Sequence, residues 1–231
     1  MLALNVSAEI INAFFMIDRG IEGSNKVIDD SNEFAMLALS KNAEQDKEKY
    51  GKLVTAAKDI QRISKEFNDY IASVRDKLVQ ESGGLYPEND EKHGGQPKGY
   101  KNKDVTTRLL VQKGEGEVIK QRILDTRKQL LDIVNSLKGT PGTNITDATI
   151  ADLENSITLG VSDDWEKAKP KRPSWAHFTF NQMPLAAIYP IFRKFQNDMK
   201  SSEAAVLNYL VSQVGATTFK VDNFIPISSA P

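Results

Sequence analysis

The hydrophobic positions near the end of the chain follow the period of a long helix. From Asn181 to Gly215 they recur at alternating steps of three and four residues. This spacing places them on one face of a helix that packs lengthwise against its neighbours. We expect this closing helix to bury Leu185, Ile188, Phe192, Phe195, Met199, Val206 and Tyr209. At about 1.5 Å per residue it is about 45 Å long, so only other long helices can cover its apolar face.

The residues at the start of the closing helix predict how it begins. Pro184 suits a first turn, where its missing N–H would have had no partner. Asn181 is placed to cap the helix, and Gly215 falls where the chain should leave it. Pro190 deletes a backbone hydrogen bond beyond the first turn, which predicts a kink or a frayed first turn.

A second apolar stripe lies near the N-terminus. It consists of Val6, Ile10, Phe14, Ile17 and Ile21. Their spacing is helical, and the pattern extends to about Ser40. No cap precedes the apolar residues 1–6, so we expect a helix that continues from an upstream segment. Gly20 and Gly23 each weaken this helix by roughly 1 kcal/mol relative to alanine. They are either tolerated glycines near a bend or positions where a partner helix approaches closely.

Two further helices and one short helix are predicted in the middle of the chain. The three-four alternation is clearest from Tyr50 to Leu78, and it returns from Val118 to Leu137. Thr146 is placed to cap a short helix that ends at about Ile157. Residues 105–111 are β-branched and predict a strand-like segment or a connector. We expect the aromatic side chains of Trp175, Phe178 and Phe180 to plug the end of the bundle.

A glycine-rich loop separates two of these helices. Ser82 to Asp104 holds five glycines and two prolines, and Tyr86 and Tyr100 are placed to pin it down. Because ordered loops of that length are unusual in a compact domain, we expect this one to be functional or mobile.

The pattern as a whole predicts an all-α fold. We expect a bundle of about four long helices plus one short helix, with the glycine-rich loop and a short C-terminal β-like exit segment. Residues 1–215 would form the helical bundle domain. Residues 216–231 alternate or run β-branched, which indicates a linker or the first strand of a further domain.

Composition excludes several classes of protein. The 231 residues carry a net charge of -1, so the chain lacks the basic excess of a nucleic-acid or membrane-surface binder. The absence of cysteine excludes disulfides, thiolate metal sites and cysteine nucleophiles. No apolar run in the sequence is long enough to span a membrane.

Candidate chemistry is sparse. His93 and His177 are far apart and belong to no metal-binding spacing. The pairs Asp29-Asp30 and Asp163-Asp164 match neither a calcium loop nor a glycosidase pair. Gly114-Glu115-Gly116 lacks the third glycine and the Lys-Ser/Thr of a phosphate loop, so a flexible turn explains it better. We therefore expect no catalytic, cofactor-binding or metal residues, and no enzyme.

Three stretches resemble the GldM/PorM family. The opening MLALNVSAEIINAFFMIDRGIE resembles the segment where these proteins leave their single transmembrane helix. The stretch MPLAAIYPIFRKFQNDMKSSEAAVLNYL, preceded by WAHFTF, is similar to their long helix. The exit FKVDNFIPISSA resembles their passage into the first of several β-sandwich domains. The resemblance covers the chain from end to end.

The resemblance implies a structural role in gliding motility and type IX protein secretion. It makes this chain the membrane-proximal periplasmic domain of a homodimeric, force-transmitting shaft, anchored in the inner membrane through a transmembrane helix absent from the chain. It implies that residues 1–6 are the residual end of that helix and that 216–231 lead into a β-sandwich domain. The implied partners are GldL, a proton-driven inner-membrane protein, and, through distal domains, the outer-membrane-associated GldK/GldN ring. Nucleic acid and small-molecule substrates are not expected.

A helical periplasmic sensor or ligand-binding module is the alternative. It predicts a defined polar pocket and a small molecule that raises the melting temperature. The sequence shows no convergent polar cluster that would form such a pocket.

Overall fold

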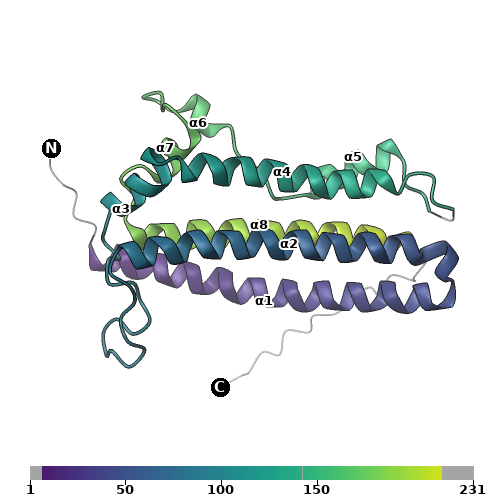
Figure 1. Cartoon of the computed structure of the whole chain (residues 1–231), viewed down its shortest axis with the longest axis horizontal. Helices are drawn as coiled ribbons and strands as arrows, with labels where there is room; N and C mark the ends of the chain where they lie inside the picture. The colour runs from purple at the N-terminus through teal and green to yellow at the C-terminus, as the bar shows by residue number, and fades with distance from the viewer. Residues whose placement is uncertain (1–6, 142, 215–231) are drawn as a thin grey trace, which may run out of the picture.

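The computed structural model describes residues 7–141 and 143–214. Four long helices run side by side in this part of the chain (Figure 1): α1 (Ala8–Gln45), α2 (Lys47–Glu81), α4 (Glu115–Ser136) and α8 (Leu185–Ser212). The shorter elements are α3 (Asp104–Thr106), the π-helix η1 (Thr107–Gln112), α5 (Asp147–Ser156), α6 (Asp164–Lys167) and α7 (Trp175–Phe180). The described residues contain no strand, so the prediction of an all-α bundle is confirmed. Residues 1–6 and 215–231, which carry the predicted membrane-proximal end and the exit segment, lie outside the described residues.

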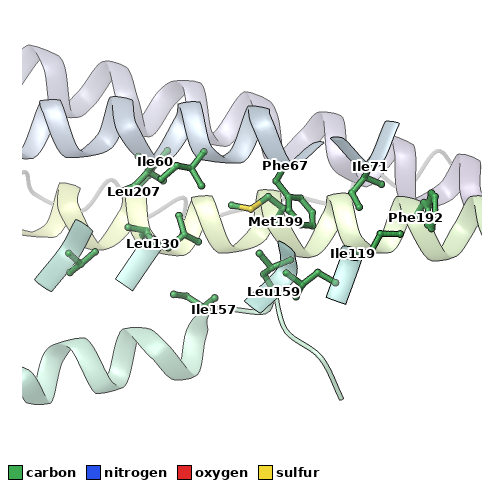
Figure 2. Close-up of a cluster of buried hydrophobic side chains, with 14 of the residues drawn as sticks. Ile60, Phe67, Ile71, Ile119, Leu130, Ile157, Leu159, Phe192, Met199 and Leu207 are labelled. Carbon is green, nitrogen blue, oxygen red and sulfur yellow. The ribbon is translucent and has the colours of Figure 1, made fainter. Parts of the chain in front are cut away.

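The apolar core lies between α2, α4 and α8. Figure 2 shows side chains from these three helices and from the segment after α5 converging along its length. They include Ile60, Phe67, Ile71, Ile119, Leu130, Ile157, Leu159, Phe192, Met199 and Leu207. Each such side chain contributes about 1.5–3 kcal/mol on burial, much of it offset by lost conformational entropy. The bundle is therefore held by many contacts spread along its length.

The closing helix begins later than expected. Asn181 caps the end of α7 instead of the start of α8, and α8 begins at Leu185. The predicted cap is wrong because the glycine-rich loop satisfies the first amides: the N–H of Leu185 donates to Asn102 O and that of Ala186 to Tyr100 O. Beyond this start, α8 is continuous from Leu185 to Ser212, with Pro190 inside the helix.

The glycine-rich loop is tied together by its own side chains. The His93 ring lies between those of Tyr86 and Tyr100, with centroids 5.1 and 5.5 Å away. The carboxylate of Asp90 accepts the backbone N–H groups of Lys92 and His93 at 3.0 and 2.7 Å. These contacts give the loop a defined path from the end of α2 towards α8.

Residues 105–111 are helical, so the prediction of a strand-like segment is wrong. Val105, Leu109 and Leu110 are buried, and their burial outweighs the β-propensity of the segment. The first turn of α4 packs closely on α7, because a Cβ on Gly116 would lie 2.6 Å from the Cβ of Ala176. This close approach explains the glycine better than a flexible turn does.

The aromatic plug is only partly as expected. Trp175 and Phe180 are buried and meet edge to face at 5.4 Å between centroids. Phe178 is 42% exposed, because it lies on the outer side of the short helix α7. Two of the three predicted aromatic residues therefore close this end of the core.

Truncation of Met199 tests the continuity of the core. Met199 is fully buried, so Met199→Ala should lower the free energy of unfolding by about 2–5 kcal/mol in urea titrations. Val118→Ala, at a half-exposed position of α4, should change it by about 0.5 kcal/mol or less. Equal effects of the two substitutions would contradict the described core.

Candidate functional site

The contact between α1 and α8 is polar in its middle and apolar at its ends. One column of α1, read at steps of seven residues, points towards α8 and is buried throughout. It consists of Ile11, Asp18, Asn25, Asn32 and Leu39. Three successive polar residues at buried positions of one helix are unusual, because each must find a partner. We call this polar stretch and its partners on α8 the polar seam.

An arginine of α8 anchors the first third of the polar seam. The Nε of Arg193 donates to Asp18 Oδ1 at 3.1 Å, and its Nη2 lies 3.5 Å from both Asp18 Oδ2 and Glu22 Oε1. The side chains of Arg193 and Asp18 are only 16% and 10% exposed. Because water screens this pair little, the attraction is stronger than that of a surface pair, and leaving either charge alone is costly.

Amide and lysine contacts continue the polar seam towards the other end. Asn197 Nδ2 donates to Asn25 Oδ1 at 2.7 Å, and the ammonium of Lys200 pairs with Asp29. Asn32 Nδ2 donates to the backbone oxygen of Lys200 at 3.3 Å. Polar pairs between α1 and α8 therefore follow one another along the two helices. Each pair can form at only one position of α1 along the axis of α8.

A buried carboxyl lies where the polar seam meets α2. Glu203 is 7% exposed, and its burial raises its pKa, although a hydrogen bond from Ser64 and the charge of Lys200 act in the opposite direction. Beside it an open recess of about 410 Å³ is lined by Asn32, Asn68 and charged residues of both signs. Most small-molecule sites are largely apolar, which this recess is not.

The residues predicted for the closing helix lie mainly in the core. Leu185, Ile188, Phe192, Met199 and Val206 are buried. Phe195 and Tyr209 are half-buried at its edge. The hydroxyl groups of Tyr209 and Thr149 are hydrogen-bonded at 2.8 Å, which ties α8 to α5.

The residues predicted for the N-terminal stripe divide between two faces of α1. Ile10 and Ile17 are about half exposed, whereas Phe14 and Ile21 are half-buried. Val6 lies outside the described residues. The polar seam determines which face of α1 contacts the bundle. Apolar periodicity did not predict this face because its central residues are polar.

The start of α1 also differs from expectation. The helix begins at Ala8, and the Ser7 side chain accepts the N–H of Ile10 at 3.4 Å. This is an ordinary N-cap with an extended backbone, so α1 does not continue upstream through Ser7 as expected. The expectation that no cap precedes residues 1–6 lies outside the described residues.

The described residues show no sign of metal chemistry or of a membrane span. In residues 7–141 and 143–214, no group of three or more His, Cys, Asp or Glu is placed to hold a metal ion. Over the same ranges no helix is long and apolar enough to cross a bilayer.

Comparison with known proteins gives the family. The family model described as the GldM N-terminal domain matches residues 9–213. The chain belongs to the GldM/PorM family. Membership confirms the resemblance, and GldM proteins are structural components of gliding-motility and type IX secretion machinery, not a family of enzymes. A search of the curated proteins finds no match to this GldM domain.

The Arg193–Asp18 pair is tested by removing its members singly and together. Arg193→Ala should cost about 2–4 kcal/mol of unfolding free energy in urea titrations, because the shielded carboxylate of Asp18 loses its partner. The double variant R193A/D18A should recover part of that loss, since one stranded charge is gone. Lys194→Ala, at a 65% exposed side chain of the same helix, should cost less than about 1 kcal/mol. Strictly additive losses for Arg193 and Asp18 would contradict the pairing.

The raised pKa of Glu203 predicts a pH dependence of stability. The folded protein holds this proton more tightly than the unfolded chain, so stability falls as pH rises through the raised pKa. Glu203→Gln should therefore melt at a higher temperature than the wild type at pH 7. This advantage should shrink as the pH falls below the ordinary value of 4.5, where the wild-type carboxyl is neutral in both states.

A matched control separates burial from a general charge effect. Glu91→Gln, on the exposed part of the glycine-rich loop, should leave the pH dependence of the melting temperature unchanged. If Glu203→Gln shifts the melting temperature equally at every pH, burial of the charge is not the cause.

Proposed function

We propose that this domain is a periplasmic strut that transmits force within the type IX secretion and gliding machinery, with α1 as the element that receives it. The observation that carries this proposal is the polar seam. Figure 1 shows α1 and α8 running together along the longest dimension of the bundle. A displacement of α1 along its axis would have to break the seam or move α8 as well.

Polar pairs resist sliding better than apolar contacts do. Apolar burial is non-directional, so a helix can shift along an apolar surface with little change in buried area. Separating Arg193 from Asp18, or Asn197 from Asn25, would leave buried polar groups without partners. An axial load on α1 therefore reaches α8, whose other face is fixed in the apolar core.

Family membership supports the remaining parts of the proposal. We place the domain in the periplasm, as part of a homodimer anchored in the inner membrane by a transmembrane helix of which residues 1–6 would be the residual end. A GldL-type proton-driven inner-membrane protein would supply the motion. Domains beyond residues 216–231, beginning with a β-sandwich, would carry it to a GldK/GldN-type ring.

The recess beside Glu203 does not favour the sensor alternative. Its lining includes Asp29 and Lys200, which pair with each other as part of the polar seam. Charges of both signs that are already engaged do not define one class of ligand.

A flexible insert at the entry to α1 tests force transmission. Four glycines inserted after Asn5 in the full-length protein should abolish gliding and secretion, because a flexible joint cannot pass an axial load. The melting temperature of the domain should not change, since the insert lies before the Ser7 cap. The same four residues inserted after Lys171, in the exposed connector between α6 and α7, serve as the control and should preserve both activities. Normal gliding and secretion with the insert after Asn5 would refute the proposal.

A further inference from the structure

The recess beside Glu203 lies where α1, α2 and α8 meet, and its lining is polar. Its volume of about 410 Å³ falls within the range of about 300–1,000 Å³ that ligand sites occupy. Four carboxyl and two ammonium groups line it: Asp29, Glu33, Asp69, Glu203, Lys65 and Lys200. The lining therefore has an excess of negative charge when every carboxyl is ionised, and this excess favours a cation.

Two amide oxygens of the recess lining have no hydrogen-bond partner. Asn32 Oδ1 and Asn68 Oδ1 are buried, and neither accepts a hydrogen bond from any of the described residues. Asn32 as a whole is only 2% exposed. Buried acceptors are rarely left unpaired, because removing them from water without a hydrogen bond costs free energy. The recess therefore lacks donors that a bound group can supply.

The groups around the two amides determine which end of each amide is free. Asn32 Nδ2 donates to the backbone oxygen of Lys200 at 3.3 Å, and Asn32 also hydrogen-bonds to the carboxyl of Glu203. Turning this amide over would place its oxygen against a carbonyl and a carboxylate, which are both acceptors. Asn68 Nδ2 donates to Ser64 Oγ at 3.5 Å, and Ser64 in turn hydrogen-bonds to Glu203. The amide N–H groups are therefore engaged, and the oxygens remain as acceptors.

The lysines of the recess do not supply the missing donors. Lys65 Nζ lies 2.5 Å from Asp69 Oδ2, and the ammonium of Lys200 pairs with Asp29. Glu33 is exposed, and no cation within residues 7–141 and 143–214 pairs with it. The engaged charges define no ligand, but the groups that remain do. They are all acceptors, so the group that fits is a cation with several N–H donors.

We propose that the recess binds a guanidinium group, carried by an arginine side chain of a partner protein. A guanidinium presents five N–H donors in a planar fork and spreads its positive charge over the whole group. One edge of the fork can pair with a carboxylate such as Glu33, while the other donors reach the amide oxygens of Asn32 and Asn68. An ammonium group is more strongly hydrated and has only three donors on one atom, so it fits less well. Force transmission through the polar seam does not require this contact, so the two proposals are independent.

Titration of the 231-residue chain with an arginine side chain tests the proposal. The probe is N-acetyl-arginine N-methylamide, followed through the backbone amide signals in NMR. We expect saturable binding with a dissociation constant on the order of 1–10 mM, because one side chain makes few contacts. The shift changes should centre on Asn32, Asn68 and Glu203. N-acetyl-citrulline N-methylamide has a similar shape without the charge, and it should bind at least about tenfold more weakly.

Two outcomes of this titration would overturn the inference. One is the absence of saturable shift changes at the recess with the arginine probe, which would mean that water alone satisfies the amide oxygens. The other is equal binding of the arginine and citrulline probes, which would mean that the charge is not recognised. Neither outcome affects the strut proposal, which depends on the Arg193–Asp18 and Asn197–Asn25 pairs.

Substitutions in the recess provide matched controls. Asn68→Ala removes one free oxygen and should weaken binding of the arginine probe about tenfold, whereas Asn135→Ala, exposed on α4, should not change it. Glu33→Gln should weaken binding severalfold, whereas Glu44→Gln, exposed on the same helix but outside the recess, should not. Because Glu33 is exposed, its substitution should leave the melting temperature unchanged and tests the site even if Asn68→Ala unfolds the chain. Unchanged affinity in both recess variants would contradict the proposal.

Glu203 provides a pH readout of the same site. Burial raises its pKa, and a guanidinium beside it would favour the ionised carboxylate. Affinity for the arginine probe should therefore fall severalfold between about pH 7 and about pH 5, as Glu203 takes up a proton. In Glu203→Gln the fall should be smaller, because only the other carboxyl groups titrate, beside two lysines that stay charged: Asp29, Glu33 and Asp69, with Lys65 and Lys200. Equal pH dependence in the two proteins would place the guanidinium away from Glu203 and contradict the proposed site.

Photo-crosslinking in the full-length protein in its membrane identifies the source of the guanidinium. A benzophenone amino acid replaces Gln61, which lines the recess. We expect a crosslinked protein whose attached peptide contains arginine, with a yield that falls severalfold when Asn68→Ala is added. A crosslink that Asn68→Ala does not affect, or the absence of any crosslinked protein, would overturn the assignment to a partner protein. Binding of the arginine probe together with no crosslink would instead assign the recess to a free guanidinium compound.

Discussion

Helix α8 has two faces of different chemistry, and the arrangement of the domain follows from that difference. Towards α2 and α4 it presents apolar side chains such as Phe192 and Met199, which exclude water and tolerate small displacements. Towards α1 it presents Arg193, Asn197 and Lys200, which are satisfied only by particular partners. The apolar face supplies cohesion, and the polar face fixes where α1 lies along the bundle.

The long helices could be predicted because apolar periodicity extends over many turns. The stretch from Tyr50 to Leu78 lies within α2, and Thr146 caps α5 as expected, with its side chain accepting the N–H of Thr149. Predictions failed where tertiary contacts replace local signals. The start of α8 is satisfied by carbonyl groups of a distant loop, and residues 105–111 are helical because five of their side chains are buried.

The polar seam was not predicted from the sequence because its residues are polar. Asp18, Asn25 and Asn32 are polar, and polar residues on a helix ordinarily belong to its solvated face. The signal that would have revealed them is their exact step of seven, matched by the same step between Arg193 and Lys200 in the closing helix. A shared period of polar residues in two distant helices is weak on its own, and it becomes informative only when both helices are assigned to one bundle.

The glycine-rich loop holds the start of α8 in place. Its last residues supply the carbonyl groups of Tyr100 and Asn102 to the first amides of α8, and Tyr100 is also stacked on His93. The glycine-rich loop, which has the least regular structure, thus stabilises the first turn of α8, the helix that packs against the core. Shifting Tyr100 by one residue along the chain would remove the carbonyl partners of the first amides of α8 and destabilise its start without touching the hydrophobic interior.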